Sequence, residues 1–184
     1  VKWQTENGEE LIISTTRPEL ICACGIVVVH PDDERYKHLI GKKAMLPLPV
    51  EGREISVEIS THPSVKSEFG SGILMVCSFG DQNDVAVFRE LGLTPFQAIN
   101  LDGCMTDLAG QWSGLTVIEA RKAIIDHLES NGQISQIVER EQEVPVSERG
   151  KNPVEIILLK EWYVRQTHIQ DRMKELIEEI TFHP

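Results

Sequence analysis

The chain has 184 residues, of which 41% are hydrophobic, and a formal net charge of −11. This length and composition are typical of one globular domain with a buried core, and they exclude an intrinsically disordered chain. No apolar run reaches the roughly 20 residues that a membrane-spanning helix needs. Such an acidic chain is not expected to hold long DNA or RNA by itself, although it can accept a nucleic-acid end that other domains deliver.

Short apolar runs alternate with polar turns through the first 80 residues, which predicts a series of short strands. The predicted strands at 44–48 and 53–59 are expected to form a hairpin around Glu51-Gly52. Short helices are expected at 31–36, where a proline and acidic residues suit a helix start, and at 84–91, before Gly92. The predicted strands are 10–15, 25–30, 44–48, 53–59 and 73–77.

The second half of the chain begins with a clear helix signal. Thr116 and Glu119 form the capping-box pattern, apolar residues follow at helical spacing, and Asn131-Gly132 marks the end of the helix. Beyond it the sequence predicts a strand at 154–159 and an amphipathic helix at 168–180.

Many short strands with a few helices predict an α/β (α+β) fold, with a distorted β-barrel or bent sheet surrounded by helices. The polar stretch 139–153 contains proline and glycine, so we expect a body at 1–145 and a C-terminal strand-helix segment at 146–184. The start at Val1, without an initiator methionine, and the end at Pro184 suggest a fragment of a longer chain.

The four cysteines lie in or beside apolar runs and show no Cys-x-x-Cys spacing. This placement predicts reduced core cysteines in a cytoplasmic protein, with no metal site. Cys22 and Cys24 would share one face of a strand, which leaves a disulfide or a metal open as an alternative.

Polar residues follow the first predicted strand directly. Thr15, Thr16 and Arg17 precede Pro18, which cannot donate a ladder hydrogen bond, so the chain leaves the sheet here. Hydroxyl groups at a strand end can bind a polar ligand, and an arginine can pair with a carboxylate or phosphate. The alternative is an ordinary helix start, with Thr15 or Thr16 as the cap and Pro18 in the first turn.

A second polar turn follows the strand at 73–77. Asp81 and Asp84 are three residues apart at the start of a predicted helix, where their carboxylates can converge. Converging carboxylates can bind an ammonium group or orient a water. The alternative is that Asp81 caps the helix and that both charges favour its positive end.

These two turns, with the stretches around them, resemble the editing domain of valyl-tRNA synthetases over nearly the whole chain. Isoleucyl enzymes differ at the positions of Arg17 and Glu19, and leucyl enzymes usually lack the stretch that begins at His30. The stretches that carry the resemblance are Ser14–Glu19, His30–Gly41, Glu68–Gly72, Gly80–Asp84, Met105–Gly110, Gly114–Lys122 and Glu161–Val164.

The resemblance implies a β-barrel domain, inserted into a catalytic domain, that hydrolyses the ester of threonyl-tRNA(Val). It implies that the domain itself uses no cofactor or metal, that ATP is used by the catalytic domain, and that the enzyme is a cytoplasmic monomer whose partner is the tRNA acceptor end.

The family's functional residues map onto both turns. By resemblance Asp84 holds the substrate ammonium and Asp81 lies near the threonine side chain, which makes these two the catalytic candidates. Thr15, Thr16 and Arg17 would line the pocket and contact the terminal adenosine. Two further candidates for substrate binding are Phe69, an aromatic at the pocket entrance, and Cys77.

The chain departs from the bacterial pattern at four positions, which favours an archaeal-type site. Met75 replaces a lysine, Cys77 a threonine, Leu20 a threonine and Gly80 a histidine. Two alternatives stay open: a non-catalytic module that only binds the acceptor end, and a structural barrel whose threonines and aspartates only cap helices. An editing domain of isoleucyl or leucyl specificity is the remaining variant.

Overall fold

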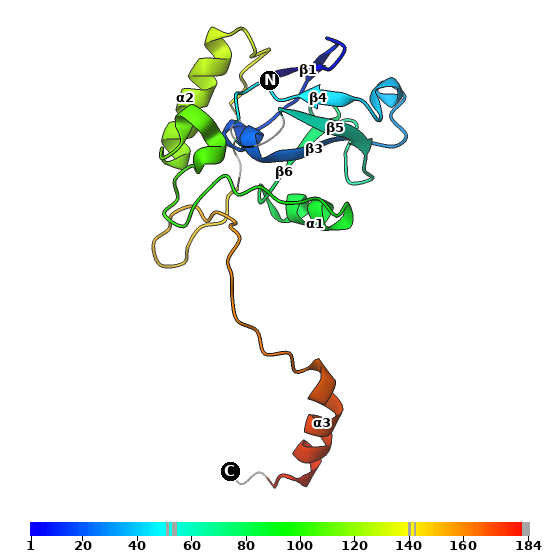
Figure 1. Ribbon diagram of the computed structural model, residues 1–184, viewed down its shortest axis with the longest axis vertical. Helices are drawn as coiled ribbons and strands as arrows, with labels where there is room; N and C mark the ends of the chain where they lie inside the picture. Colours follow the sequence, from blue (N-terminus) through cyan, green and yellow to red (C-terminus); the bar gives the residue numbers. More distant parts are fainter. Residues whose placement is uncertain (51, 53–54, 140, 142, 182–184) are drawn as a thin grey trace.

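The structure is a computed structural model that describes residues 1–50, 52, 55–139, 141 and 143–181. Six strands form one curled, mixed sheet in the order β2-β1-β4-β5-β3-β6, which confirms the predicted bent sheet (Figure 1). Only the β3–β5 pair is parallel among the strand pairs of the described residues. The strands are β1 (Lys2–Thr5), β2 (Glu10–Ile12), β3 (Cys24–Val29), β4 (Lys43–Met45), β5 (Ser56–Thr61) and β6 (Ile73–Cys77).

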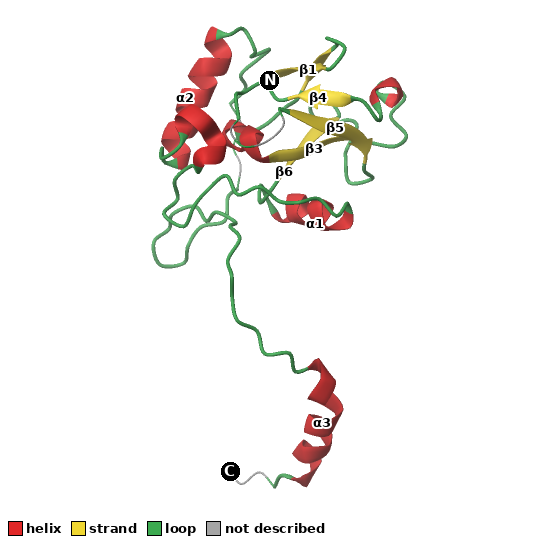
Figure 2. Ribbon diagram, in the orientation of Figure 1, coloured by secondary structure: helices red, strands yellow, loops and turns green. Residues whose placement is uncertain are grey.

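Helices lie on two sides of this sheet, and a third helix lies apart from it. Figure 2 shows α1 below β3 and β6, α2 beside the end of the sheet, and α3 at the end of an extended C-terminal segment. The helices are α1 (Gln82–Glu90), α2 (Val117–Ser130) and α3 (Gln170–Glu179). The 3-10 turns are η1 (Pro18–Ala23), η2 (Lys37–Leu39), η3 (Asp107–Trp112) and η4 (Thr167–Ile169).

Strand β3 is buried on both faces, which explains its unbroken apolar sequence. Val27 and Val29 point into the main core, whereas Ile26 and Val28 pack into a smaller cluster with Phe88 and other residues of α1. A Cβ atom on the glycine that precedes Ile26 would lie 2.4 Å from Phe88 Cζ, so only glycine at position 25 lets α1 approach this closely. This contact sets the position of α1, on which the candidate site depends.

Helix α2 begins and ends where the sequence predicted. The hydroxyl of Thr116 accepts from the backbone N–H of Glu119, and the Glu119 carboxylate accepts from the backbone N–H of Thr116, which completes the capping box. Ala120, Ile124 and Leu128 are fully buried against the main core. The helix thereby covers η1, the 3-10 turn that directly follows Arg17.

Two predicted elements are wrong, and one is only partly described. Residues 31–36 form turns rather than a helix, because the Asp33 carboxylate binds Arg35 in its own turn. Residues 154–159 are not a strand: among the described residues the only ladder contact near them is an isolated bridge between Val146 and Pro153. The predicted hairpin strands pair as β4 and β5, but residues 51, 53 and 54 lie outside the described part.

The four cysteines are reduced, as predicted, and three of them are buried. Cys22 lies in η1 and Cys24 opens β3, so they do not share one strand face as the alternative required. In the part of the chain that the structure describes, no cluster of three or more histidine, cysteine or acidic side chains is arranged to hold a metal ion. None of the described helices is long and apolar enough to cross a membrane.

The C-terminal region does not pack as one piece. Ile157 packs against the main core, whereas Trp162 and Tyr163 are almost completely exposed and α3 has no buried residue. The predicted helix at 168–180 is thus confirmed as η4 and α3, and its apolar residues face solvent. The division of the chain at 145/146 stays a prediction.

Candidate functional site

The first polar turn is organised by Arg17 rather than by a threonine. Arg17 is the N-cap residue of η1 and makes no side-chain cap, so the alternative in which Thr15 or Thr16 caps this turn is wrong. The Thr15 hydroxyl instead accepts from the backbone N–H of Arg17 at 3.0 Å, and Pro18 occupies the first turn. Thr16 is exposed. The Arg17 side chain lies between Glu19 of η1 and the Gly80 carbonyl, which follows the end of β6.

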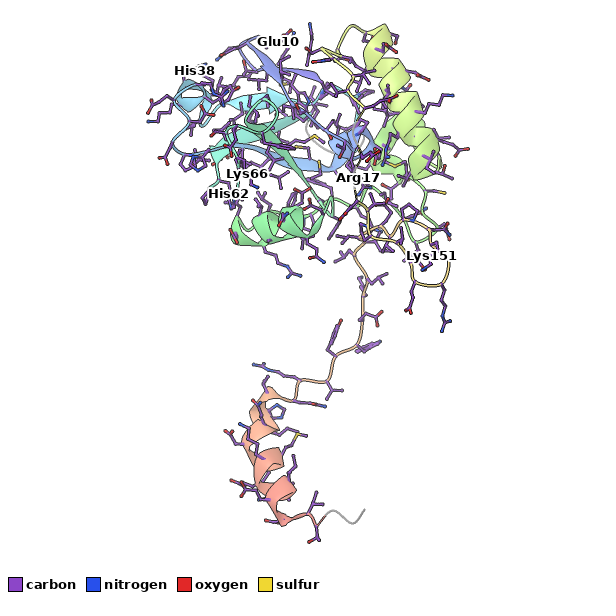
Figure 3. The ribbon with its side chains drawn as sticks, turned by 180° about the vertical axis from the view of Figure 1, so that it is seen from behind. Glu10, Arg17, His38, His62, Lys66 and Lys151 are labelled. Carbon is purple, nitrogen blue, oxygen red and sulfur yellow. The ribbon has the colours of Figure 1, made fainter. Side chains whose placement is uncertain are left out.

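The Arg17 guanidinium makes three charged or polar contacts in three parts of the chain. Its Nε donates to Glu19 Oε1 at 3.0 Å, one Nη donates to the Gly80 carbonyl at 3.1 Å, and the other Nη donates to Glu155 Oε2 at 2.6 Å. Burial alone would lower the pKa of Arg17, but the hydrogen bonds and charges of Glu155 and Glu19 outweigh it and raise the pKa. Figure 3 shows Arg17 beside the point where the C-terminal segment leaves the body.

Glu19 supplies the inner anchor of this group. Its side chain is fully buried, and it accepts from Arg121 Nε at 3.0 Å and from an Arg121 Nη at 2.8 Å as well as from Arg17. The two arginines compensate a carboxylate charge that burial would otherwise make costly. Because Arg121 lies on α2, the helix, η1 and Arg17 are tied into one unit.

The second polar turn follows β6 and is held against the first. The Ser78 hydroxyl donates to the Ala23 carbonyl at 3.3 Å and accepts from the Phe96 backbone N–H at 2.8 Å. Phe79 has a φ of 59°, a left-handed conformation that is strained for an aromatic residue. The strained turn aims the Gly80 carbonyl at Arg17, and this contact brings the two predicted turns together.

Asp81 and Asp84 have different roles. The Asp81 carboxylate is the N-cap of α1 and accepts from the Asp84 backbone N–H at 2.8 Å, which confirms the capping interpretation for this residue. The Asp84 carboxylate turns back toward β6 and accepts from the Cys77 backbone N–H at 3.3 Å. A Cβ atom on Gly80 would lie 2.0 Å from Asp84 Oδ2, so this orientation requires glycine at position 80.

Asp84 is poised to exchange a proton near neutral pH. Burial, followed by the negative charge of Asp81, raises its pKa from 3.8 to about 7, against the opposing effects of the Cys77 N–H and Arg17. A half-buried carboxyl group with this pKa can bind a cation, hold a hydroxyl group or accept a proton from water.

The remaining predicted residues surround this centre at different depths. Phe69 is 57% exposed on a turn whose Gly70 lies against Ser14, next to the first polar turn. Cys77 is buried, and a hydrogen bond with Cys24, followed by burial, raises the pKa of its thiol well above the ordinary value. Its backbone N–H donates to the Asp84 carboxylate.

Sequence reasoning missed three residues of the site: Glu19, Arg121 and Glu155. Glu19 and Arg121 lie in stretches that carry the family resemblance, but neither residue was assigned a role in the site. Arg17 and Glu155 are 138 positions apart, and no local pattern marks such a pair.

The sequence is similar along its whole length to part of the archaeal valine–tRNA ligases. It is 42% identical over 179 residues to the valine–tRNA ligase of Aeropyrum pernix, which covers 97% of this chain and 21% of that enzyme. It is 40% identical over 185 residues to that of Methanocaldococcus jannaschii, which covers 100% of this chain and 21% of the enzyme. The chain thus spans about a fifth of the length of these relatives. No protein-family profile matches it.

Solved structures show the same fold at low sequence identity. The crystal structure of the CP1 domain of a leucyl-tRNA synthetase, GlLeuRS-CP1, matches with a TM-score of 0.55 and 14% identity, over 73% of this chain and 85% of that domain. The leucyl-tRNA synthetase from Agrobacterium radiobacter K84, in a ternary complex with tRNA and LeuAMS, matches with a TM-score of 0.54 and 18% identity, over 71% of this chain and 18% of that one.

Proposed function

We propose that this chain hydrolyses the ester of mischarged threonyl-tRNA(Val). It is homologous to a segment that makes up about one fifth of the length of archaeal valine–tRNA ligases, and it has the fold of synthetase editing domains. The observation that carries this proposal is the contact between Arg17 and the Gly80 carbonyl. This contact joins the turn that contains Thr15 and Thr16 to the turn that leads into Asp84. A shared site requires such a contact, whereas two unrelated helix starts would not.

The proposal fits a known need for proofreading in valine selection. Threonine is nearly isosteric with valine, and an apolar pocket rejects an added hydroxyl group by only about 10²-fold, a value established for valyl enzymes themselves rather than derived from this structure. A second, polar site can accept threonine through its hydroxyl group, whereas valine would leave buried polar groups there unpaired.

Asp84 would hold the α-ammonium group of the threonyl ester. Binding that cation lowers the pKa of the carboxyl group from about 7, so the bound state carries a carboxylate that pairs with the ammonium. The anchored ester then faces the polar rim formed by Thr15 and Thr16. A water positioned there attacks the ester carbonyl, and the ester oxygen of the terminal ribose leaves with a proton. Orientation of an already activated ester accounts for much of the rate.

The acidic surface agrees with a division of labour within a longer enzyme. With a net charge of −11 this segment would contribute little phosphate binding, so other parts of the synthetase would deliver the acceptor end. A tRNA-bound leucyl-tRNA synthetase of the same fold supports tRNA as the partner.

A second candidate is a module that binds the acceptor end without hydrolysis. It is favoured by Met75 and Cys77, which are buried where bacterial valyl enzymes carry a lysine and a threonine. A deacylation assay distinguishes the two functions, because a binding module would leave threonyl-tRNA(Val) intact.

The test is Asp84→Ala in the full-length synthetase, assayed for deacylation of threonyl-tRNA(Val). We expect a loss of at least about 10²-fold, because the ester would lose its ammonium anchor. Asp126→Ala removes an exposed carboxylate on α2 and serves as the matched control. Unchanged deacylation by the Asp84 variant would refute the assignment, and no deacylation by the unaltered enzyme would support the binding module.

A further inference from the structure

We propose that Glu155 is a positioning residue of the candidate site, and that it acts by holding the Arg17 guanidinium on the Gly80 carbonyl. The inference rests on the proposed deacylation at the same site. It assigns a role in that reaction to a segment that follows the sheet and the helices α1 and α2, because Glu155 comes 25 residues after Ser130, the last residue of α2.

Residues 154–157 lie on the body through four successive contacts. The Val154 backbone N–H donates to the Pro145 carbonyl at 3.0 Å, and Glu155 pairs with Arg17 at 2.6 Å. Ile156 closes a small cavity whose other walls include Ser78 and Phe79 of the strained turn. Ile157 packs against the main core, and beyond it the chain becomes exposed. This segment is therefore seated against the turn that carries Gly80.

Arg17 is held from two sides by carboxylates. Glu19 is fully buried and already shared with Arg121, so it fixes the inner edge of the guanidinium group. Glu155 holds the outer edge, and its side chain is 22% exposed. Among the described residues, Glu155 is the only charged partner outside η1 for the Arg17 Nη that it binds. Without Glu155 the guanidinium can therefore rotate about its contact with Glu19 and away from Gly80.

Displacement of Arg17 would reach Asp84 in two ways. The Gly80 carbonyl would lose its donor, which loosens a turn that already contains the strained Phe79. The groups that face the Asp84 carboxylate are Asp81, the Cys77 backbone N–H and Arg17, and Arg17 is the cation among them. Moving this cation away raises the Asp84 pKa further, so less carboxylate is present at neutral pH.

A purely structural ion pair makes a different prediction. Glu155 would then contribute only a small part of the stability, as partly exposed pairs do, and its loss would leave the site unchanged. The distinction lies in the pH dependence of deacylation and in the protection of the 78–84 turn, neither of which a simple loss of stability moves selectively.

The experiment compares Glu155→Gln with Glu148→Gln in the full-length synthetase. Glu148 is exposed on the same segment and provides the same change of charge. Deacylation of threonyl-tRNA(Val) is measured across pH, aminoacylation with valine reports on the rest of the enzyme, and hydrogen exchange reports on residues 78–84.

For Glu155→Gln we expect kcat for deacylation to fall by about tenfold or more with a smaller change in KM, because the ammonium anchor is misplaced rather than removed. The acid limb of the pH profile should move to higher pH, and amide exchange at 78–84 should increase. Glu155→Asp, which keeps the charge, should recover part of the loss. Glu148→Gln should change none of these.

Unaltered kcat, pH profile and exchange in Glu155→Gln would overturn the inference. If the variant also lost aminoacylation, exchange measured at 78–84 against the rest of the enzyme would decide, because protection lost uniformly contradicts a role at this turn. Absence of deacylation in the unaltered enzyme would refute the proposed function instead, and exchange at 78–84 would still test whether Glu155 holds the turn.

Discussion

The two ends of α1 are held in opposite ways. At the N-terminal end two carboxylates, Asp81 and Asp84, lie close together, and a strained turn precedes them. At the C-terminal end Glu90 accepts from His62 Nε2 at 3.0 Å, and His62 Nδ1 accepts from the Ser64 hydroxyl at 2.7 Å and from its backbone N–H at 3.2 Å. The N-terminal end of α1 thus keeps two carboxylates together, whereas at the C-terminal end both ring nitrogens of His62 have a hydrogen-bond partner.

This difference indicates how the helix can carry a reactive carboxyl group. The well-bonded C-terminal end and the apolar contact of Phe88 with β3 hold α1 on the sheet. The N-terminal end can then keep Asp84 half-buried at a cost in stability. Functional sites commonly combine such local strain with firm support elsewhere. Three substitutions test the comparison, in order of expected effect.

The largest effect is expected from Gly80→Ala. The added Cβ would lie 2.0 Å from Asp84 Oδ2 and would force the carboxylate out of its present orientation. The Gly80 φ angle is not left-handed, so alanine is compatible with the backbone. We expect deacylation of threonyl-tRNA(Val) to fall by about 10²-fold.

A double-mutant cycle isolates this effect. In an Asp84→Ala background the Gly80→Ala change has no carboxylate to displace, so it should add little to the loss. Full additivity of the two losses would show that Gly80 acts on something other than Asp84.

His62→Ala tests the opposite end of α1 and should separate stability from activity. It removes a buried ring with two hydrogen-bonding nitrogens, so the free energy of unfolding should fall by about 1–2 kcal/mol. Deacylation at temperatures where the variant is folded should be unchanged. Urea unfolding and a deacylation assay check both expectations. Glu90→Gln keeps an acceptor for Nε2 and should cost less. A selective loss of deacylation would show that the two ends of α1 are not independent.

The sequence predicted those parts of the site that local patterns encode. A strand that runs into Asp81 and Asp84 at a helix start has a recognisable spacing, and the Thr116–Glu119 box defined the start of α2. The alternative interpretation of the first polar turn placed Pro18 correctly in the first turn of a helix, but it named the wrong cap. The Thr15 hydroxyl accepts from the Arg17 N–H, and Arg17 is the N-cap residue of η1.

The long-range contacts could not be predicted in the same way. Glu155 lies in an apolar stretch that suggested a strand, yet its backbone pairs with no strand in the described residues and its side chain reaches Arg17. Glu19 and Arg121 are 102 positions apart, and only the packing of α2 on η1 brings them together. Charged pairs of this kind depend on tertiary structure, which periodicity and capping signals do not describe.

Asp84→Asn should produce the smallest effect on stability over most of the pH range, a gain that appears only as the pH rises. The folded state keeps the Asp84 proton up to about pH 7, whereas the unfolded chain releases it near the ordinary pKa of 3.8. Between these values the folded state binds more protons, so the free energy of unfolding falls as pH rises through this window. Above it, the folded chain carries a half-buried carboxylate that asparagine lacks.

The variant should therefore match the unaltered chain near pH 4 and exceed its free energy of unfolding by about 1–2 kcal/mol at pH 8. Urea unfolding at the two pH values measures the difference, and Asp126→Asn, at an exposed position on α2, is the matched control. A gain for Asp84→Asn that is equal at both pH values would mean that the carboxylate charge is not what destabilises this end of α1. A gain confined to high pH, together with lost deacylation, would show that the charge which costs stability is the one the site requires.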